Sequence, residues 1–121
     1  FETSKNFYDR ILPALGFRKV KETTTSARWS DGKNSFSIKQ TSEEYLKNTY
    51  HRKNPGINHV AFRATSREAV DVFHREVLER IDIPTLYSSP KDYPEYREGY
   101  YAVFFEDPDR LKIEVMWASG V

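Results

Sequence analysis

The spacing of hydrophobic residues predicts two helices. In the second half of the chain, apolar side chains recur every three or four positions, as on one face of a helix: Val70, Phe73, Val77, Leu78 and Ile81. Residues 2–16 repeat this pattern when Phe7 is aligned on Phe73. The chain is therefore predicted to contain the same amphipathic element twice.

Residues that start and stop helices set the limits of both elements. Thr65 followed by Glu68 has the spacing of a capping box, and Pro84 prevents any continuation of the second helix. In the first helix, Pro13 predicts a bend, and Gly16 predicts an end in the left-handed conformation.

Stretches rich in β-branched and aromatic residues follow each helix and predict strands. They lie at 17–25, 26–32 and 34–40 in the first half, and at 83–90, 100–106 and 111–117 in the second half. Turn residues at 31–34 and 107–110 predict tight connections between neighbouring strands. Another strand, at 57–62, precedes the second helix. By symmetry, we expect the first helix to follow a corresponding strand, which would lie before Phe1.

The chain thus consists of two similar modules joined by a polar segment. Module one covers about 1–41, the linker about 42–55 and module two about 56–118. We expect His51 to be a solvated linker residue and His74 to lie on the helix surface.

Composition narrows the class of protein. The 121 residues suit one domain, and 38% hydrophobic and 15% aromatic residues suffice for a core. The formal net charge of +1 predicts no binding to nucleic acid or to an anionic membrane surface. No apolar stretch approaches the roughly 18–20 residues of a membrane span. The absence of cysteine is typical of a reducing compartment, so we expect a cytoplasmic protein.

His59 and Glu114 are the candidate residues for chemistry, because each lies inside an apolar strand. Side chains alternate between strand faces, so His59 shares a face with Ala61, and Glu114 shares one with Lys112. A carboxylate is costly to bury without a partner, and a metal ion would satisfy both residues. Taken singly, His59 could instead be a core histidine bonded to a backbone carbonyl, and Glu114 could pair with Lys112 or Arg63.

Several segments resemble the vicinal oxygen chelate superfamily, which contains glyoxalase I, bleomycin-resistance proteins, extradiol dioxygenases and fosfomycin-resistance thiol transferases. They are SKNFYDRILPALGF, INHVAFRATSREAVDVFHREVLE and GYYAVFFEDPDRLKIEVMW. Arg110 departs from the glycine usual in this family. The resemblance implies an α+β fold. In it, two βαβββ modules form a curved, cup-shaped mixed sheet with helices on the outer face, and the first strand of module one is absent from this sequence.

The resemblance also implies a metal site. His59 and Glu114 match two ligands of a divalent cation (Zn, Ni, Mn or Fe), and Glu114 is the candidate catalytic residue as well. The third ligand would be a histidine on the absent first strand. A fourth position falls near 36–40, where only Ser37 and Gln40 could coordinate. The bound metal would hold two neighbouring oxygens of a small-molecule substrate.

A tyrosine-rich segment at 87–101 predicts a substrate contact, because tyrosine combines apolar area with a hydroxyl group. We expect Tyr96, Arg97 and Tyr100 to bind the substrate. The alternative is that these tyrosines pack on the outside of the sheet or against a second subunit.

Two functions of different class follow. The first is a metal-dependent lyase, isomerase or thiol transferase acting on a small metabolite; the chain is too short for an extradiol dioxygenase. The alternative is a metal-independent protein of the bleomycin-resistance type that binds a drug or metabolite. A third possibility is a domain without a working site that serves only for association. In each case the family resemblance implies a homodimer.

Overall fold

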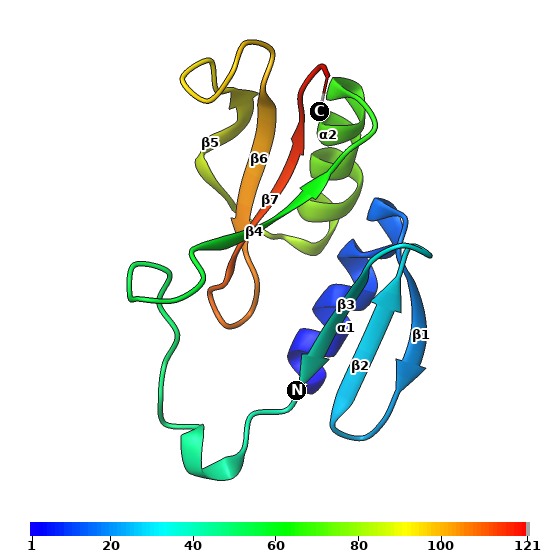
Figure 1. The fold of residues 1–121 in the computed structure, drawn as a ribbon, viewed down its shortest axis with the longest axis vertical. Coiled ribbons are helices and arrows are strands. Elements are labelled where there is room, and N and C mark those ends of the chain that lie inside the picture. Colours follow the sequence, from blue (N-terminus) through cyan, green and yellow to red (C-terminus); the bar gives the residue numbers. More distant parts are fainter. Residues whose placement is uncertain (121) are drawn as a thin grey trace. The chain divides into compact units, whose positions relative to one another are not determined.

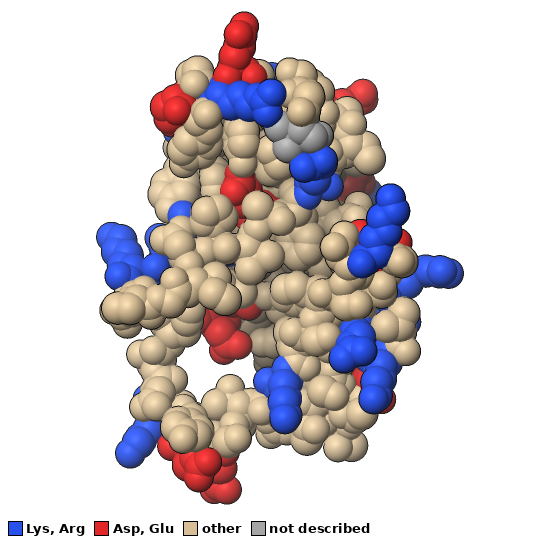
Figure 2. Space-filling model, viewed as in Figure 1, with Lys and Arg blue, Asp and Glu red and all other residues tan. Residues whose placement is uncertain are grey.

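Residues 1–120 are described by a computed structural model, and the chain divides into two units, Phe1–Tyr50 and His51–Val121 (Figure 1). No helix in the described range is long and apolar enough to cross a membrane. Lys and Arg side chains lie interspersed with Asp and Glu on the face shown in Figure 2, as the balanced composition suggests.

The first unit contains one helix followed by three strands. Its elements are α1 (Glu2–Ile11), a 3-10 turn (Pro13–Leu15), β1 (Arg18–Glu22), β2 (Ser26–Ser30), β3 (Ser35–Lys39) and a second 3-10 turn (Glu43–Tyr45). The strands form an antiparallel sheet in the order β1-β2-β3. The predicted irregularity at Pro13 is confirmed, and Gly16 ends the turn with a φ of 88°.

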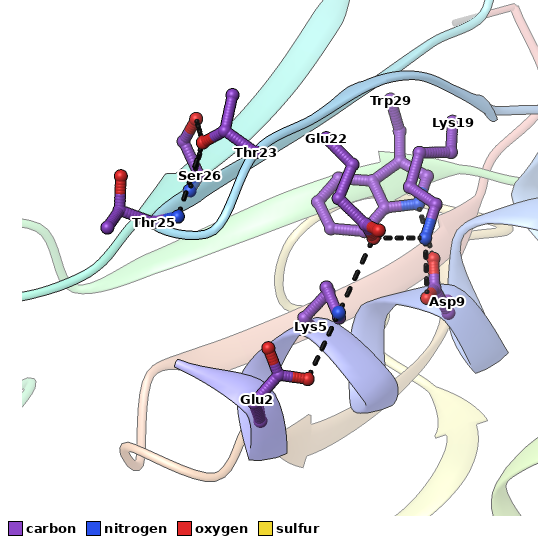
Figure 3. Close-up of polar contacts among 9 residues, drawn as sticks. All are labelled: Glu2, Lys5, Asp9, Lys19, Glu22, Thr23, Thr25, Ser26 and Trp29. Atoms are coloured by element: carbon purple, nitrogen blue, oxygen red, sulfur yellow. Dashed lines mark hydrogen bonds and ion pairs between the residues drawn. The ribbon is translucent and has the colours of Figure 1, made fainter.

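Helix α1 is held to this sheet by buried apolar residues and by one polar network. Tyr8, Ile11 and Trp29 are almost fully buried. Figure 3 shows Asp9 on α1 accepting hydrogen bonds from the Trp29 indole (3.1 Å) and from Lys19 (2.9 Å). These bonds connect β2 and β1, respectively, to the helix. Burial of each large side chain contributes about 1.5–3 kcal/mol.

The second unit has the complete βαβββ order. It contains β4 (His59–Arg63), α2 (Arg67–Phe73) with a π turn (His74–Leu78) and a 3-10 turn (Glu79–Ile81), then β5 (Thr85–Asp92), β6 (Tyr101–Glu106) and β7 (Lys112–Trp117). The sheet order is β4-β7-β6-β5, with β4 parallel to β7 and the other pairs antiparallel. The predicted α+β class and mixed sheet are therefore confirmed.

The predicted start of the second helix is wrong by one residue. Ser66, not Thr65, is the N-cap, and its hydroxyl accepts a hydrogen bond from the backbone of Ala69 (3.0 Å). Glu68 then falls in the first turn, where its charge favours the helix dipole, rather than at the capping-box position.

The two faces of the second sheet have different roles. Helix α2 packs on the face that carries Phe105, with the rings of Phe73 and Phe105 5.8 Å apart. Phe105 pairs with Ile113 of β7, so α2 covers the apolar face of the last strand. The opposite face carries a second cluster around Phe104 and Met116, and it also carries the candidate site residues.

Candidate functional site

His59 and Glu114 lie side by side on the face opposite α2. Strands β4 and β7 are parallel neighbours, and their register pairs His59 with Lys112 and Ala61 with Glu114. The side chains of His59 and Glu114 point the same way, and the Nε2 atom of His59 lies 3.0 Å from an Oε atom of Glu114. Alternation along each strand, together with this register, places both residues on one face of the sheet.

The carboxylate of Glu114 is buried and has a partner at each oxygen. Its side chain is 3% exposed. One oxygen faces His59, and the other accepts a hydrogen bond from the Tyr100 hydroxyl. Burial raises the pKa of Tyr100, and the bond to Glu114 raises it further, so the phenol is a neutral donor. Neither alternative partner, Lys112 or Arg63, pairs with Glu114 among the described ion pairs.

Asn58 determines which nitrogen of His59 carries a proton. The amide nitrogen of Asn58 donates to the carbonyl of Arg52 (3.3 Å), so its oxygen faces the Nδ1 atom of His59 at 2.8 Å. That oxygen can only accept, so Nδ1 is protonated. In the neutral ring, the lone pair of Nε2 then points at the Glu114 carboxylate. Two electron-rich atoms at this distance require a proton or a cation between them.

The geometry of this pair suits a divalent cation. Nitrogen and oxygen ligands lie about 2.0–2.2 Å from such a metal, so two ligands at right angles lie roughly 3 Å apart. The observed 3.0 Å separation matches that value, and it is also the length of an ordinary hydrogen bond. Within residues 1–120, no third His, Cys, Asp or Glu joins the pair. Ser37 and Gln40 belong to the first unit, where the Ser37 hydroxyl already accepts from Arg28 (3.1 Å).

The three predicted substrate residues lie at different distances from the pair. Tyr100 contacts Glu114 directly. Tyr96 is 59% exposed, and its ring lies edge-on to that of Tyr100, with centroids 5.4 Å apart. The described contacts of Arg97 are backbone hydrogen bonds with Tyr93 (3.4 Å) and Tyr100 (3.1 Å), which shape the loop. Tyr100 is thus part of the site, Tyr96 borders it, and Arg97 is not brought to Glu114.

Lys112 and Tyr87 were not predicted as site residues. The Nζ atom of Lys112 lies 3.3 Å from the Tyr87 hydroxyl and 5.4 Å from the centroids of both the Tyr87 and Phe104 rings. Burial would raise the pKa of Tyr87, but the hydrogen bond and charge of Lys112, together with Arg52, outweigh burial and lower it. Strand alternation puts Lys112 on the same face as Glu114, so the position of Lys112 beside the site could have been predicted from the sequence.

Comparison with known proteins gives relatives over nearly the whole chain. The uncharacterized protein YqjT of Bacillus subtilis (strain 168) is 34% identical over 118 residues, which is 98% of this chain and 91% of YqjT. A crystal structure of a candidate glyoxalase from Bacillus halodurans superposes with a TM-score of 0.86 at 34% identity, covering 96% of this chain and 86% of that one. No family model matches the sequence.

More distant structures share the fold alone. A glyoxalase/bleomycin resistance protein from Albidiferax ferrireducens has a TM-score of 0.72 at 24% identity, covering 96% of this chain and 88% of that one. A Glu-to-Gln mutant of the fosfomycin resistance protein FosX from Listeria monocytogenes, in a complex with Mn(II) and 1S,2S-dihydroxypropylphosphonic acid, has a TM-score of 0.66 at 14% identity. This match covers 98% of the present chain and 82% of FosX.

Proposed function

Because this chain belongs to the glyoxalase/bleomycin resistance/dioxygenase (vicinal oxygen chelate) superfamily, we propose that it is a divalent-metal-dependent enzyme acting on a small metabolite. The reaction would be that of a lyase, an isomerase or a thiol transferase. His59 and Glu114 would hold the cation, and Glu114 would also take part in the chemistry. The observation that carries this proposal is the Nε2 atom of His59 facing a buried carboxylate at 3.0 Å.

The donor set limits the choice of metal and of chemistry. One nitrogen and one oxygen ligand suit Zn, Ni, Mn or Fe. When bound, such a cation acts as a Lewis acid that stabilises negative charge on two neighbouring substrate oxygens. FosX, which shares the fold, is known with Mn(II) and a dihydroxy compound.

Residues of this chain would prepare the site in two ways. The neutral hydroxyl of Tyr100 holds one oxygen of Glu114 and keeps the other directed at His59. Asn58 keeps the proton of His59 on Nδ1, so that Nε2 is free to bind. The carboxylate of Glu114 would serve as a general base, and Tyr96 and Arg97 are proposed to contact the substrate from the adjoining loop.

Titration with MnCl2 and ZnCl2, followed by calorimetry and elemental analysis, tests this proposal. We expect Glu114→Gln to weaken binding at least about tenfold, because a charged ligand is replaced by a neutral amide. Glu79→Gln is the matched control, since Glu79 is an exposed glutamate of the same unit, with its side chain 59% accessible. Equal metal affinity for wild type and Glu114→Gln would contradict the proposal.

A second candidate is a metal-independent binding protein of the bleomycin-resistance type. It is favoured by one observation: His59 and Glu114 already contact each other at 3.0 Å, and no third ligand from residues 1–120 joins them. The exposed rings of Tyr87 and Tyr96 would then contact an aromatic ligand. Chelator-treated protein that binds bleomycin or a similar drug, and that takes up no metal, would favour this function.

The assembly and location of the protein stay predictions. We expect a homodimer, which multi-angle light scattering will test, and a cytoplasmic protein that does not bind nucleic acid.

A further inference from the structure

Lys112 is positioned beside the proposed reaction site. It lies on β7 two residues before Glu114, on the same face, and the register of β4 and β7 places it opposite His59. Its Nζ atom and the His59 ring both flank the ring of Phe104, at 5.4 and 6.1 Å from the Phe104 centroid. A small molecule in contact with His59 can therefore also reach the ammonium group.

This cation has no carboxylate partner among residues 1–120. Among the ion pairs of the described residues, none includes Lys112; its contacts are the Tyr87 hydroxyl and two aromatic rings. Glu106, its cross-strand neighbour on β6, already accepts from Arg52 and Arg110, each at 3.2 Å. Lys112 is thus a half-buried positive charge, and the glutamate opposite it on β6 is engaged elsewhere.

The Tyr87 hydroxyl completes a pair of donors. It accepts a hydrogen bond from Lys112, so its own proton remains available to a further acceptor. Arg52 lies close enough to the same hydroxyl to affect its ionisation, which adds positive charge on this side. Two donors in a positive environment bind an oxyanion more strongly than a neutral acceptor, because such hydrogen bonds are charge-assisted.

We propose that Lys112 and Tyr87 form an anion subsite that binds the oxyanion group of the substrate, a carboxylate or a phosphoryl group. The substrate class is a small anionic metabolite whose charged group is held by this subsite and whose neighbouring oxygens face His59 and Glu114. The position of the reacting oxygens rests on the proposed function, whereas anion binding at Lys112 and Tyr87 does not require a metal.

Binding of two simple probes to the metal-free full chain tests the subsite. Inorganic phosphate and acetate are titrated separately at constant ionic strength, and binding is followed by NMR shifts of the backbone amides of 86–88 and 111–113. We expect saturable binding of at least one probe, and we expect Lys112→Met to weaken it about tenfold or more. The probe that binds identifies the substrate group as phosphoryl or carboxylate.

Two further variants make the result specific. Lys91→Met is the matched control, because the Lys91 ammonium lies 5.3 Å from the Tyr93 ring centroid in the same unit, and we expect it to bind like wild type. Tyr87→Phe removes only the hydroxyl and should weaken binding without affecting the fold. Absence of saturable binding to wild type, or equal affinity of Lys112→Met and Lys91→Met, would overturn the subsite.

Metal titration of the same variants separates the two proposals. Lys112→Met should retain the metal affinity of wild type while losing anion binding, because Lys112 is not a metal ligand. Glu114→Gln should show the opposite behaviour: it should lose metal binding and retain the binding of phosphate or acetate. A wild type that binds an anion at Lys112 but no metal would refute the proposed function and leave the subsite standing.

Discussion

At the scale of single residues, the Asn58 amide controls the ring of His59. Its orientation is fixed by the carbonyl of Arg52, and its oxygen holds the proton of His59 on Nδ1. Outer partners of this kind orient a metal-binding histidine and raise its basicity, and their loss costs about 10–100-fold in affinity. We therefore expect Asn58→Ala to weaken binding of Mn²⁺ at least about tenfold, measured by isothermal titration calorimetry.

Two variants control this measurement. Asn58→Asp keeps an acceptor at the same position and should retain most of the affinity. Asn48→Ala removes an exposed amide before β4 and should bind like wild type. If Asn58→Ala binds Mn²⁺ as tightly as Asn48→Ala does, the amide does not position His59.

Alternation along each strand predicts the face on which His59 and Glu114 lie, but the pairing of β4 with β7, which brings the two residues together, is seen only in the structure. Strand alternation does not predict the position of the Tyr87 side chain. The register of β5 shifts between Leu86 and Lys91, and Tyr87 has a φ of 59°. Ser89 bridges this irregularity by donating to Leu86 and accepting from Phe104. Asn58 was missed for a different reason: its role depends on a rotamer and on a carbonyl six residues earlier.

At the scale of elements, Tyr101 joins α2 to the sheet. Its hydroxyl donates to Asp71 on the helix (2.5 Å). The guanidinium of Arg67 makes a cation–π contact with its ring, 3.9 Å from the centroid. Burial raises the pKa of Tyr101, and the bond to Asp71 raises it further, to about 12. The folded state therefore favours the neutral phenol more than the unfolded chain does, in which the pKa is about 10.

The sign of the pH dependence follows from this difference. The hydrogen bond stabilises the fold fully below about pH 10 and is lost as the pH rises through about 12. We expect Tyr101→Phe to cost about 1 kcal/mol at pH 7 in urea unfolding. This cost should decrease between about pH 10 and 12. Tyr96→Phe, at an exposed ring, is the control; a cost for Tyr101→Phe that is constant up to pH 12 would contradict the assignment.

The helices and strands were predictable because their hydrophobic periods are clear, but their limits depend on partners. The predicted strand 57–62 begins at His59 in the structure, since its parallel partner β7 begins at Lys112, opposite His59. The strand predicted at 83–90 extends to Asp92 because Asp92 pairs with Tyr101 on β6. The local sequence pattern of a strand does not predict which strand it pairs with, or in which register.

At the scale of the whole molecule, residues 41–50, which connect the two sheets in the sequence, are the part of the backbone most accessible to a protease. Every residue from 41 to 50 is exposed, and the only regular structure there is the turn Glu43–Tyr45. A protease needs several residues of accessible, unpaired backbone, which paired strands do not provide. Lys47 lies within this segment. After it, Arg52 is held by Glu106 at 3.2 Å, and the backbone of Lys53 donates to the His51 ring at 3.1 Å.

Limited digestion with trypsin, followed by mass spectrometry at early times, should therefore cut first after Lys47. The expected products are residues 1–47 and 48–121, each retaining the complete sheet of one unit. In Lys47→Gln the first cut should be delayed, because Lys39 is paired in β3, Arg52 is held by Glu106, and the backbone of Lys53 is bonded to His51. An initial cut within β1, at Arg18 or Lys19, would instead show that the edge of the first sheet opens more readily than the segment that follows it.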